Sequence, residues 1–370
     1  MTRLRPLAGL LFAVCLGILA GRAAAAADLE WRDARQLTLE GQAWPDVAAP
    51  FDRLPARAEK LVRPPVWNLS RQSAGLMVRF RSDARMLQAR WTLTSSNLAM
   101  PHMPATGVSG LDLYVRRPDG RWSFLANGRP TQQQNTVTLV QDGPAGTHDY
   151  LLYLPLYNGV QQLEIGVPGG ALLEAGAPRP VERRRPIIFW GTSITQGGCA
   201  SRPGMVHTAI LGRRLDYPVV NLGFSGNGKM EAELGQLIGE IDAAALVLDC
   251  LPNMTAEEVT ERTVPLVKIF RQARPALPIL LVEDRSYSDS YWLAGKRHRN
   301  ETSRAALRAA FEQLQRDGVA RLYYVAGENQ LGDDAEGTVD TSHPTDLGFV
   351  RLADALTGPL QQALRDAGAN

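Results

Sequence analysis

A series of short, unbroken apolar runs in the second half of the chain most restricts the fold that this sequence can adopt. Strands without polar alternation are typical of a sheet that is buried on both faces. Segments with helical spacing separate the runs, at 231–241, 255–273 and 301–316. This alternation of strand and helix predicts an α/β fold with a doubly wound parallel sheet. The apolar runs are Pro186-Ile-Ile-Phe-Trp190, Val219-Val-Asn-Leu222, Ala245-Leu-Val-Leu-Asp249, Leu277-Pro-Ile-Leu-Leu-Val282 and Leu322-Tyr-Tyr-Val325.

The first half of the chain has a different pattern, in which apolar and polar residues alternate over short runs such as Leu87-Gln-Ala-Arg-Trp-Thr-Leu93. Turn-forming pairs, among them Asn127-Gly128 and Asp142-Gly143, separate these runs. The pattern predicts a β-sandwich of jelly-roll type over 28–180, followed by the α/β domain over 181–370. We interpret the proline- and arginine-rich segment 178–185 as the boundary between the two domains.

The first 27 residues have the order of a secretory signal peptide. Two arginines precede an apolar run at 6–20, and an alanine-rich segment follows at 22–27. The run is shorter than the roughly 20 residues that a membrane span needs. We therefore expect cleavage near 25–27 and a periplasmic or secreted protein without stable membrane insertion. An uncleaved anchor is the alternative interpretation of this segment.

Charge and cysteine content exclude some classes of partner and leave others open. The chain has 40 basic and 38 acidic residues, and this near-balance gives no reason to expect nucleic acid as a partner. Beyond the signal peptide, Cys199 and Cys250 remain, and they can form one disulfide or stay free thiols. No Cys-x-x-Cys or His-x-x-x-His pair occurs, so no metal site is expected. The oligomeric state is left open.

Polar residues suited to acyl-transfer chemistry follow the predicted strands. Ser193 comes shortly after the first apolar run, where ligand sites form in open α/β sheets. Near the chain end, Asp340 precedes His343 by three residues, so one loop can hold a carboxylate against an imidazole. Gly226 and Asn253 each follow another strand and can donate an N–H to an oxyanion. Taken singly, each has an ordinary explanation, such as a helix N-cap at Ser193 or a turn at Asn253.

In the order Ser, Gly, Asn and Asp-x-x-His, these residues resemble the SGNH (GDSL-like) hydrolase superfamily. The resemblance implies that Ser193 is the nucleophile, His343 the general base and Asp340 the acid that orients it. It also implies an oxyanion hole formed by Ser193, Gly226 and Asn253. Two blocks depart from the family pattern. Gly191-Thr-Ser193 replaces Gly-Asp-Ser, and Leu251-Pro-Asn253-Met254 lacks the glycine and the last aspartate of Gly-x-Asn-Asp.

A second motif extends the resemblance over nearly the whole mature chain. Gly110-Leu-Asp-Leu-Tyr114 resembles the Gly-x-Asp-Leu-Tyr motif of a subgroup that places a β-sandwich before the hydrolase domain. The Gly-x-Ser-x-Gly pattern of α/β-hydrolases is absent, because Asn227 takes the last place. Of the other histidines, His207 is interpreted as structural and His298 as solvated in a basic loop.

The resemblance implies a serine esterase that needs no metal or organic cofactor. The expected substrate is a small acyl ester, acetyl above all, on a small molecule or a carbohydrate. An acyltransferase with the same triad is one alternative, and a carbohydrate-binding envelope protein with an idle site is another. Four aromatic residues of the sandwich can stack on sugars but are more simply core residues; they are Trp91, Trp122, Tyr153 and Tyr157.

Overall fold

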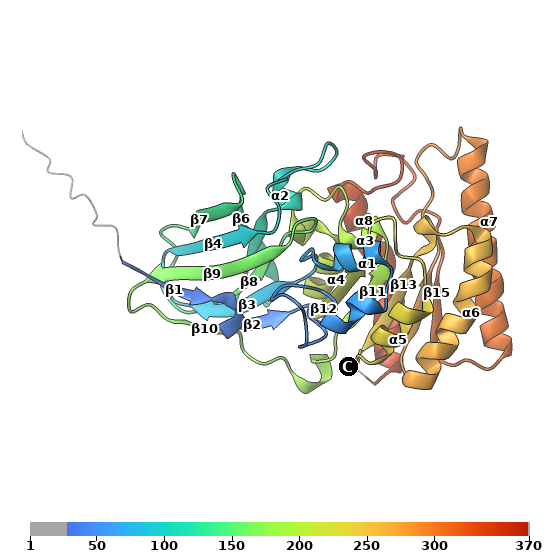
Figure 1. Ribbon diagram of the computed structural model, residues 1–370, viewed down its shortest axis with the longest axis horizontal. Helices are drawn as coiled ribbons and strands as arrows, with labels where there is room; N and C mark the ends of the chain where they lie inside the picture. Colours follow the sequence, from blue (N-terminus) through green and yellow to red (C-terminus); the bar gives the residue numbers. More distant parts are fainter. Residues whose placement is uncertain (1–27, 369–370) are drawn as a thin grey trace, which may run out of the picture.

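The computed structural model describes residues 28–368, so the predicted signal peptide lies outside the described residues. Figure 1 shows a β-rich unit formed by the first half of the chain and, beside it, an α/β unit formed by the second half. Within the described residues, no helix combines the length and apolar character that crossing a bilayer requires.

Two antiparallel sheets form the N-terminal unit and confirm the predicted sandwich. Along β4 every second side chain is buried, because alternate residues face the core between the two sheets. The first sheet has the order β1 (Leu29–Asp33), β9 (Val160–Pro168), β4 (Leu87–Leu93) and β7 (Gln134–Val140). The second has the order β10 (Leu173–Ala175), β3 (Met77–Ser82), β8 (His148–Tyr153), β5 (Leu111–Arg116) and β6 (Trp122–Gly128), with β2 (Thr38–Glu40) paired to β3.

Five parallel strands form the sheet of the second unit. Their order is β12 (Val219–Gly223), β11 (Ile187–Gly191), β13 (Ala245–Asp249), β14 (Ile279–Val282) and β15 (Leu322–Val325). The strand order reverses at β11, because β12 lies on one side of it and β13 on the other. In open α/β sheets, ligand sites form beyond the carboxyl ends of the strands at such a point.

Helices cover both faces of this sheet, which confirms the doubly wound arrangement. Successive residues of β11 face opposite sides, so that Ile188 and Trp190 join one core and Ile187 and Phe189 the other. The first core is covered by α5 (Ala232–Gly239), α6 (Ala256–Ala273) and α7 (Ala294–Arg316), and the second by α4 (His207–Leu215) and α8 (Asp346–Asp366).

The helices begin close to the predicted positions, with one clear difference. The predicted capping box is present at α6, where the Thr255 hydroxyl accepts the Glu258 N–H and the Glu258 carboxylate accepts the Thr255 N–H. In contrast, α7 begins at Ala294, so His298 lies in a helix and the prediction of a basic loop there is wrong. This first part of the helix has no apolar stripe that the sequence could reveal. Hydrogen bonds from Lys296 to Asp289 and from Arg299 to the Pro252 carbonyl hold it in place.

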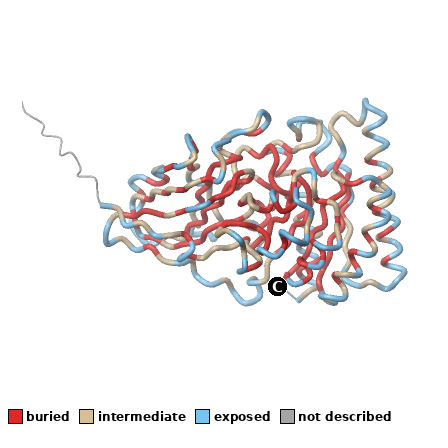
Figure 2. Tube along the Cα trace, viewed as in Figure 1, coloured by how far each residue is buried: buried red, intermediate tan, exposed pale blue. Residues whose placement is uncertain are grey.

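The two units share hydrophobic cores, which the sequence patterns did not indicate. Trp44, Leu54 and the α1 (Pro64–Ser70) residue Trp67 belong to the first half of the chain but pack into the core of the α/β sheet. The buried Arg53 guanidinium donates to the carbonyl groups of residues 221 and 223, in the last part of β12. Figure 2 accordingly shows buried chain continuing from one unit into the other.

Candidate active site

Ser193 lies at the carboxyl end of the central strand β11. It is the first residue of the short helix α3 (Ser193–Gln196). The preceding residue, Thr192, caps this helix, because its side chain accepts the Ile194 N–H at 3.3 Å. The Ser193 hydroxyl therefore does not serve as the cap and can bond elsewhere, although the residue is only 9% exposed.

The structure brings Ser193, His343 and Asp340 into one hydrogen-bonded chain. Ser193 Oγ lies 2.7 Å from His343 Nε2, and His343 Nδ1 lies 2.7 Å from Asp340 Oδ2. The other carboxylate oxygen, Asp340 Oδ1, accepts the backbone N–H of His343 at 2.8 Å and of Ser342 at 3.2 Å. One carboxylate thus fixes both the histidine ring and the loop that carries it.

The charge on Asp340 sets the tautomer of His343. Burial raises the pKa of Asp340, but the hydrogen bonds from the backbone and ring of His343 outweigh burial and hold this pKa below its ordinary value. An ionised carboxylate beside Nδ1 favours the tautomer with the proton on Nδ1 and the lone pair on Nε2. The ring nitrogen that faces the Ser193 hydroxyl is then a proton acceptor.

Gly226 and Asn253 lie on adjoining loops after β12 and β13. Gly226 has a φ of +69°, which favours glycine, and no atom lies within 4 Å of the position that a Cβ would take. With its Oδ1 facing the Gly226 turn, the Asn253 carboxamide accepts the N–H of Asn227 at 3.0 Å and of Gly228 at 3.2 Å. Asn253 therefore holds the turn that carries Gly226.

Gln196 and Tyr157 hold the loops that surround Ser193, and no sequence motif pointed to Gln196. Its Oε1 accepts the Ser225 N–H at 3.0 Å, and its Nε2 donates to the Leu156 carbonyl at 3.1 Å. The Tyr157 hydroxyl donates to the Ser193 carbonyl at 3.1 Å, and burial raises the pKa of this phenol. Tyr157 thus positions the serine loop.

The other three aromatic residues considered for sugar stacking lie within the sandwich. Trp91 and Tyr153 are buried, so their rings are not available to a sugar. Trp122 is half-buried, and the Arg116 guanidinium lies over its ring. The interpretation as core residues therefore holds for Trp91 and Tyr153.

The Gly-x-Asp-Leu-Tyr motif bonds the sandwich to the loop that follows α3. The Asp112 carboxylate is fully buried and accepts from Arg202 Nη1 and from the Gly204 N–H, both at 2.8 Å. The Tyr114 hydroxyl accepts from Arg202 at 2.7 Å. Gly204 lies so close to Tyr114 that a Cβ there would be 2.3 Å from the hydroxyl oxygen. The motif therefore fixes residues 202–204 against the sandwich.

A loop of the sandwich also reaches His343. Residues 94–110 connect β4 to β5 and contain α2 (Ala105–Val108), where the Thr106 hydroxyl donates to the Ser201 carbonyl at 2.6 Å. Met103 of this loop packs into the α/β core. The ring centroid of His102 lies 6.3 Å from that of His343. No signal for this approach is present in the sequence, because His102 lies in the predicted sandwich segment, far from His343 along the chain.

Both cysteines are free thiols, which answers the question that the sequence left open. Cys250 is buried beside the Trp190 carbonyl, at 3.5 Å. Cys199 lies next to the serine and histidine loops with a φ of +72°. Burial and, second, the charge of Asp340 raise the pKa of Cys199 to about 12, so it stays a thiol near neutral pH.

A buried ion cluster lies beneath the strand ends. Asp249, the last residue of β13, pairs with Arg285 at 2.5 Å and accepts from the Thr195 hydroxyl at 3.3 Å. Burial raises the pKa of Asp284 to about 6, although Arg285 opposes this shift. His207 stacks on an aromatic ring of α8, and burial and, second, Arg285 lower its pKa to about 3. His207 is thus a neutral core residue, in agreement with its structural interpretation.

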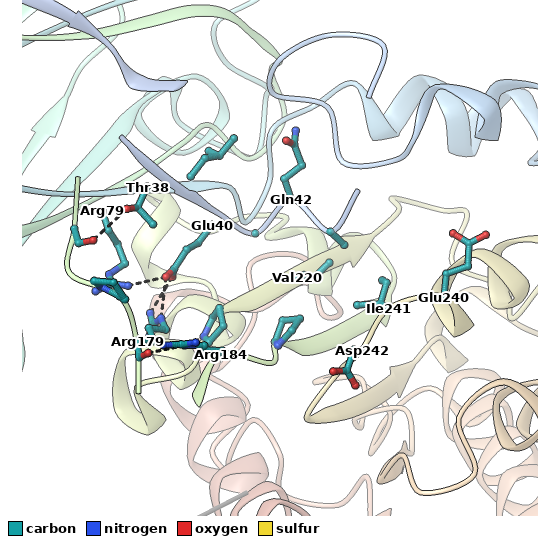
Figure 3. A pocket seen from close by; sticks show the side chains of 17 residues that line it. Thr38, Glu40, Gln42, Arg79, Arg179, Arg184, Val220, Glu240, Ile241 and Asp242 are labelled. Carbon is teal, nitrogen blue, oxygen red and sulfur yellow. Dashed lines mark hydrogen bonds and ion pairs between the residues drawn. The ribbon is translucent and has the colours of Figure 1, made fainter. Parts of the chain in front are cut away.

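A cavity of about 660 Å³ lies between the two units, away from the serine. Pro186 and Pro218, which precede β11 and β12, line it, so it lies at the amino ends of the strands, whereas Ser193 follows a carboxyl end. Figure 3 shows Glu40 in this cavity between two arginines, Arg79 and Arg179, to which it is hydrogen-bonded. The charges of this cluster are paired with one another. We therefore interpret it as a structural contact that holds the two units together.

Comparison with known proteins gives the family. The sequence model of the GDSL-like Lipase/Acylhydrolase family matches residues 184–361, and that of the GxDLY domain, the N-terminus of SGNH-hydrolase-type esterases, matches residues 29–173. A protein of solved structure from Bacteroides ovatus, named as a GDSL-like lipase, is 35% identical. The match covers 91% of this chain and 98% of that one, with a TM-score of 0.86.

More distant structures share the two-unit fold. A salicylyl-acyltransferase from a tetracycline biosynthetic pathway is 20% identical, with a TM-score of 0.73 over 90% of this chain and 97% of its own. A family two carbohydrate esterase from Clostridium thermocellum, in complex with cellohexaose, is 17% identical, with a TM-score of 0.59 over 79% of this chain and 94% of its own. No similar sequence is found among the curated proteins. The chain belongs to the GDSL-like lipase/acylhydrolase family and carries an N-terminal GxDLY domain.

Proposed function

We propose that the protein is an exported serine esterase that hydrolyses small acyl esters, acetyl esters in particular, on carbohydrate. One observation carries the proposal. Ser193 Oγ, the His343 ring and the Asp340 carboxylate are joined by two hydrogen bonds of 2.7 Å each. This arrangement can activate a serine hydroxyl for attack on a carbonyl carbon. The order of charges, apolar residues and alanines in residues 1–27 supports export.

The first half of the reaction forms an acyl-enzyme. His343 Nε2 accepts the hydroxyl proton as Ser193 Oγ attacks the ester carbonyl, and the imidazolium is stabilised by Asp340. The same proton then passes to the alcohol oxygen as the carbon–oxygen bond breaks. In the second half, water gives a proton to His343 and attacks the acyl group, and Ser193 recovers its proton. General base catalysis of this kind contributes roughly 10²- to 10⁴-fold.

Backbone and side-chain N–H groups stabilise the oxyanion in this proposal. The Ser193 N–H stands at the start of α3, and the Gly226 N–H is carried by a turn that leaves open space at the glycine. The Asn253 carboxamide, which holds that turn, completes the set through Nδ2. One such donor is typically worth roughly 10²- to 10³-fold in turnover.

The carbohydrate part of the proposal draws support from proteins that share this fold. The Clostridium thermocellum structure is named as a carbohydrate esterase with bound cellohexaose. An acetyl xylan esterase from Butyrivibrio proteoclasticus has a TM-score of 0.57 over 91% of this chain. The salicylyl-acyltransferase shares the fold as well, so a hydroxyl acceptor in place of water is the second candidate.

The test compares the mature protein with its Ser193→Ala variant on p-nitrophenyl acetate, longer-chain esters and acetylated xylan. We expect the wild-type protein to prefer acetate and release acetate from xylan, and the variant to lose both activities. Product analysis with added sugar alcohols separates hydrolysis from acyl transfer. Absence of turnover by wild-type protein on all of these substrates would overturn the proposal.

A further inference from the structure

We propose that Cys199, Asp340 and His343 form an inhibitory binding site for Zn²⁺ or a similar thiophilic divalent cation. The three residues supply a thiol sulfur, a carboxylate oxygen and a ring nitrogen, which are the ligand types that zinc prefers in proteins. The inhibitory effect rests on the proposed function, because the ion would bind the same histidine and aspartate that ester hydrolysis uses. Binding of the ion itself can be measured without any catalytic assay.

The geometry suits a metal ion with little rearrangement. One ligand atom from each residue lies within 4.8 Å of the other two. Zinc–ligand bonds of about 2.0–2.3 Å place the donors of a tetrahedral site roughly 3.5 Å apart. The thiol has to approach by at most about 1.3 Å, while the Asp340–His343 pair opens slightly from 2.7 Å. Side-chain rotation alone can supply movements of this size.

The loop that carries the thiol is held rigidly beside the triad. Cys199 has a left-handed backbone, with a φ of +72°. The residue before it, Gly198, lies so close to the histidine that a Cβ added there would be 3.2 Å from His343 Cδ2. Two residues after Cys199, the Ser201 N–H donates to the Asp346 carboxylate at 3.0 Å, and the Ser201 hydroxyl donates to its other oxygen. Because these contacts fix the loop before any ion arrives, binding loses little conformational freedom.

An ion has a route to this site from solvent. The side chains of Asp340 and His343 are 42% and 26% exposed, whereas the Cys199 thiol lies beneath them. Solvent water can therefore fill the fourth position of a tetrahedral complex. Cys250 differs in this respect, since it is fully buried and belongs to no comparable group of ligands within residues 28–368.

Metal binding removes the general base whichever ring nitrogen it uses. If the ion takes Nδ1, the ring proton moves to Nε2, which then cannot accept the Ser193 proton. If the ion takes Nε2, the lone pair that faces Ser193 is occupied. In either case the thiol loses its proton to solvent, so one Zn²⁺ replaces one proton and no electrons are transferred.

The experiment measures Zn²⁺ binding and inhibition for wild-type protein, Cys199→Ala and the matched control Cys250→Ala. Zinc chloride is titrated into metal-free mature protein by calorimetry, and p-nitrophenyl acetate hydrolysis is followed at the same free Zn²⁺ concentrations. For wild type and Cys250→Ala we expect one tight site and inhibition that EDTA reverses. For Cys199→Ala we expect at least 10-fold weaker binding and inhibition, with activity retained without zinc.

The outcomes separate this inference from the proposed function. Equal Zn²⁺ affinity in wild type and Cys199→Ala would overturn the site, whatever the activity. A protein that hydrolyses no ester yet loses zinc binding in Cys199→Ala keeps the site and overturns the function. Thermal melts show that each variant is folded, and Cys199→Ser, which keeps a small polar side chain, repeats the test if Cys199→Ala does not fold.

Discussion

Asp340 performs two tasks with its two carboxylate oxygens, since one holds the backbone of its loop and the other holds the His343 ring. In Asp340→Asn the loop contact can persist, but the amide can present an N–H to Nδ1 and favour the wrong tautomer. We expect kcat to fall by roughly 10²- to 10⁴-fold with little change in KM. Steady-state kinetics on p-nitrophenyl acetate measure this effect, and a variant with near wild-type kcat would remove Asp340 from the mechanism.

Asp284 makes stability depend on pH. Its pKa in the fold is about 6 against an ordinary value of 3.8, so the folded state binds more protons between these values, and stability falls as pH rises through this window. The full shift corresponds to about 3 kcal/mol. We expect Asp284→Asn to raise the Tm relative to wild type at pH 8, with the difference shrinking as pH falls and vanishing near pH 3, about one unit below the ordinary pKa. A difference independent of pH would contradict this account.

Single residues show how far the sequence could predict the site. That the serine, aspartate and histidine come together was predictable, because they stand in short local blocks beside strand ends and in a recognisable order. The state of Cys199 and Cys250 was not, since it depends on distances between loops. The role of Gln196 also escaped prediction, because a glutamine that bridges two loops has no sequence signature.

At the scale of elements, strand β5, which carries the Gly-x-Asp-Leu-Tyr motif, fixes the loop that follows α3. Asp112→Ala takes the buried carboxylate away from the partly buried Arg202 guanidinium and from the Gly204 N–H. Breaking a buried pair from one side costs about 3–5 kcal/mol. We expect a lower Tm and, because this loop directly follows α3, which begins at Ser193, a lower kcat as well.

The matched control for this change is Asp119→Ala. Asp119 lies in the exposed turn between β5 and β6 and pairs with the surface arginines Arg117 and Arg121. A surface pair of this kind is worth about 0–1 kcal/mol, so the Tm should hardly change. Equal losses in Asp112→Ala and Asp119→Ala, measured by thermal denaturation, would contradict the role given to the motif.

The strands were more predictable than the segments between them. Period-2 runs and unbroken apolar runs each reflect how many faces of a sheet are buried, so β4, β13 and β15 lie where the sequence places them. The start of α7 was missed because helical residues without an apolar stripe give no periodic signal. The packing of residues 44–67 against the α/β sheet was also missed. An apolar residue in the sequence indicates that its side chain is buried, but it does not indicate in which of the two units.

At the scale of the whole molecule, the α/β unit depends on the first half of the chain. Residues such as Trp44 and Leu54 fill its core, and Arg53 bonds carbonyl groups of β12. We therefore expect a truncated chain of residues 181–370 to expose apolar surface and to unfold without a cooperative transition. Dye binding and thermal melts test this, and a truncated chain that melts cooperatively near the wild-type Tm would contradict it.

The central claim is that Ser193 carries the acyl group during turnover. The most direct measurement is a rapid acid quench of the mature protein with p-nitrophenyl acetate, followed by peptide mapping by mass spectrometry. We predict one acetyl group on the peptide that contains Ser193 in wild-type protein and none there in Ser193→Ala. Continued ester turnover without acetylation of Ser193, or with equal turnover in Ser193→Ala, would contradict the account.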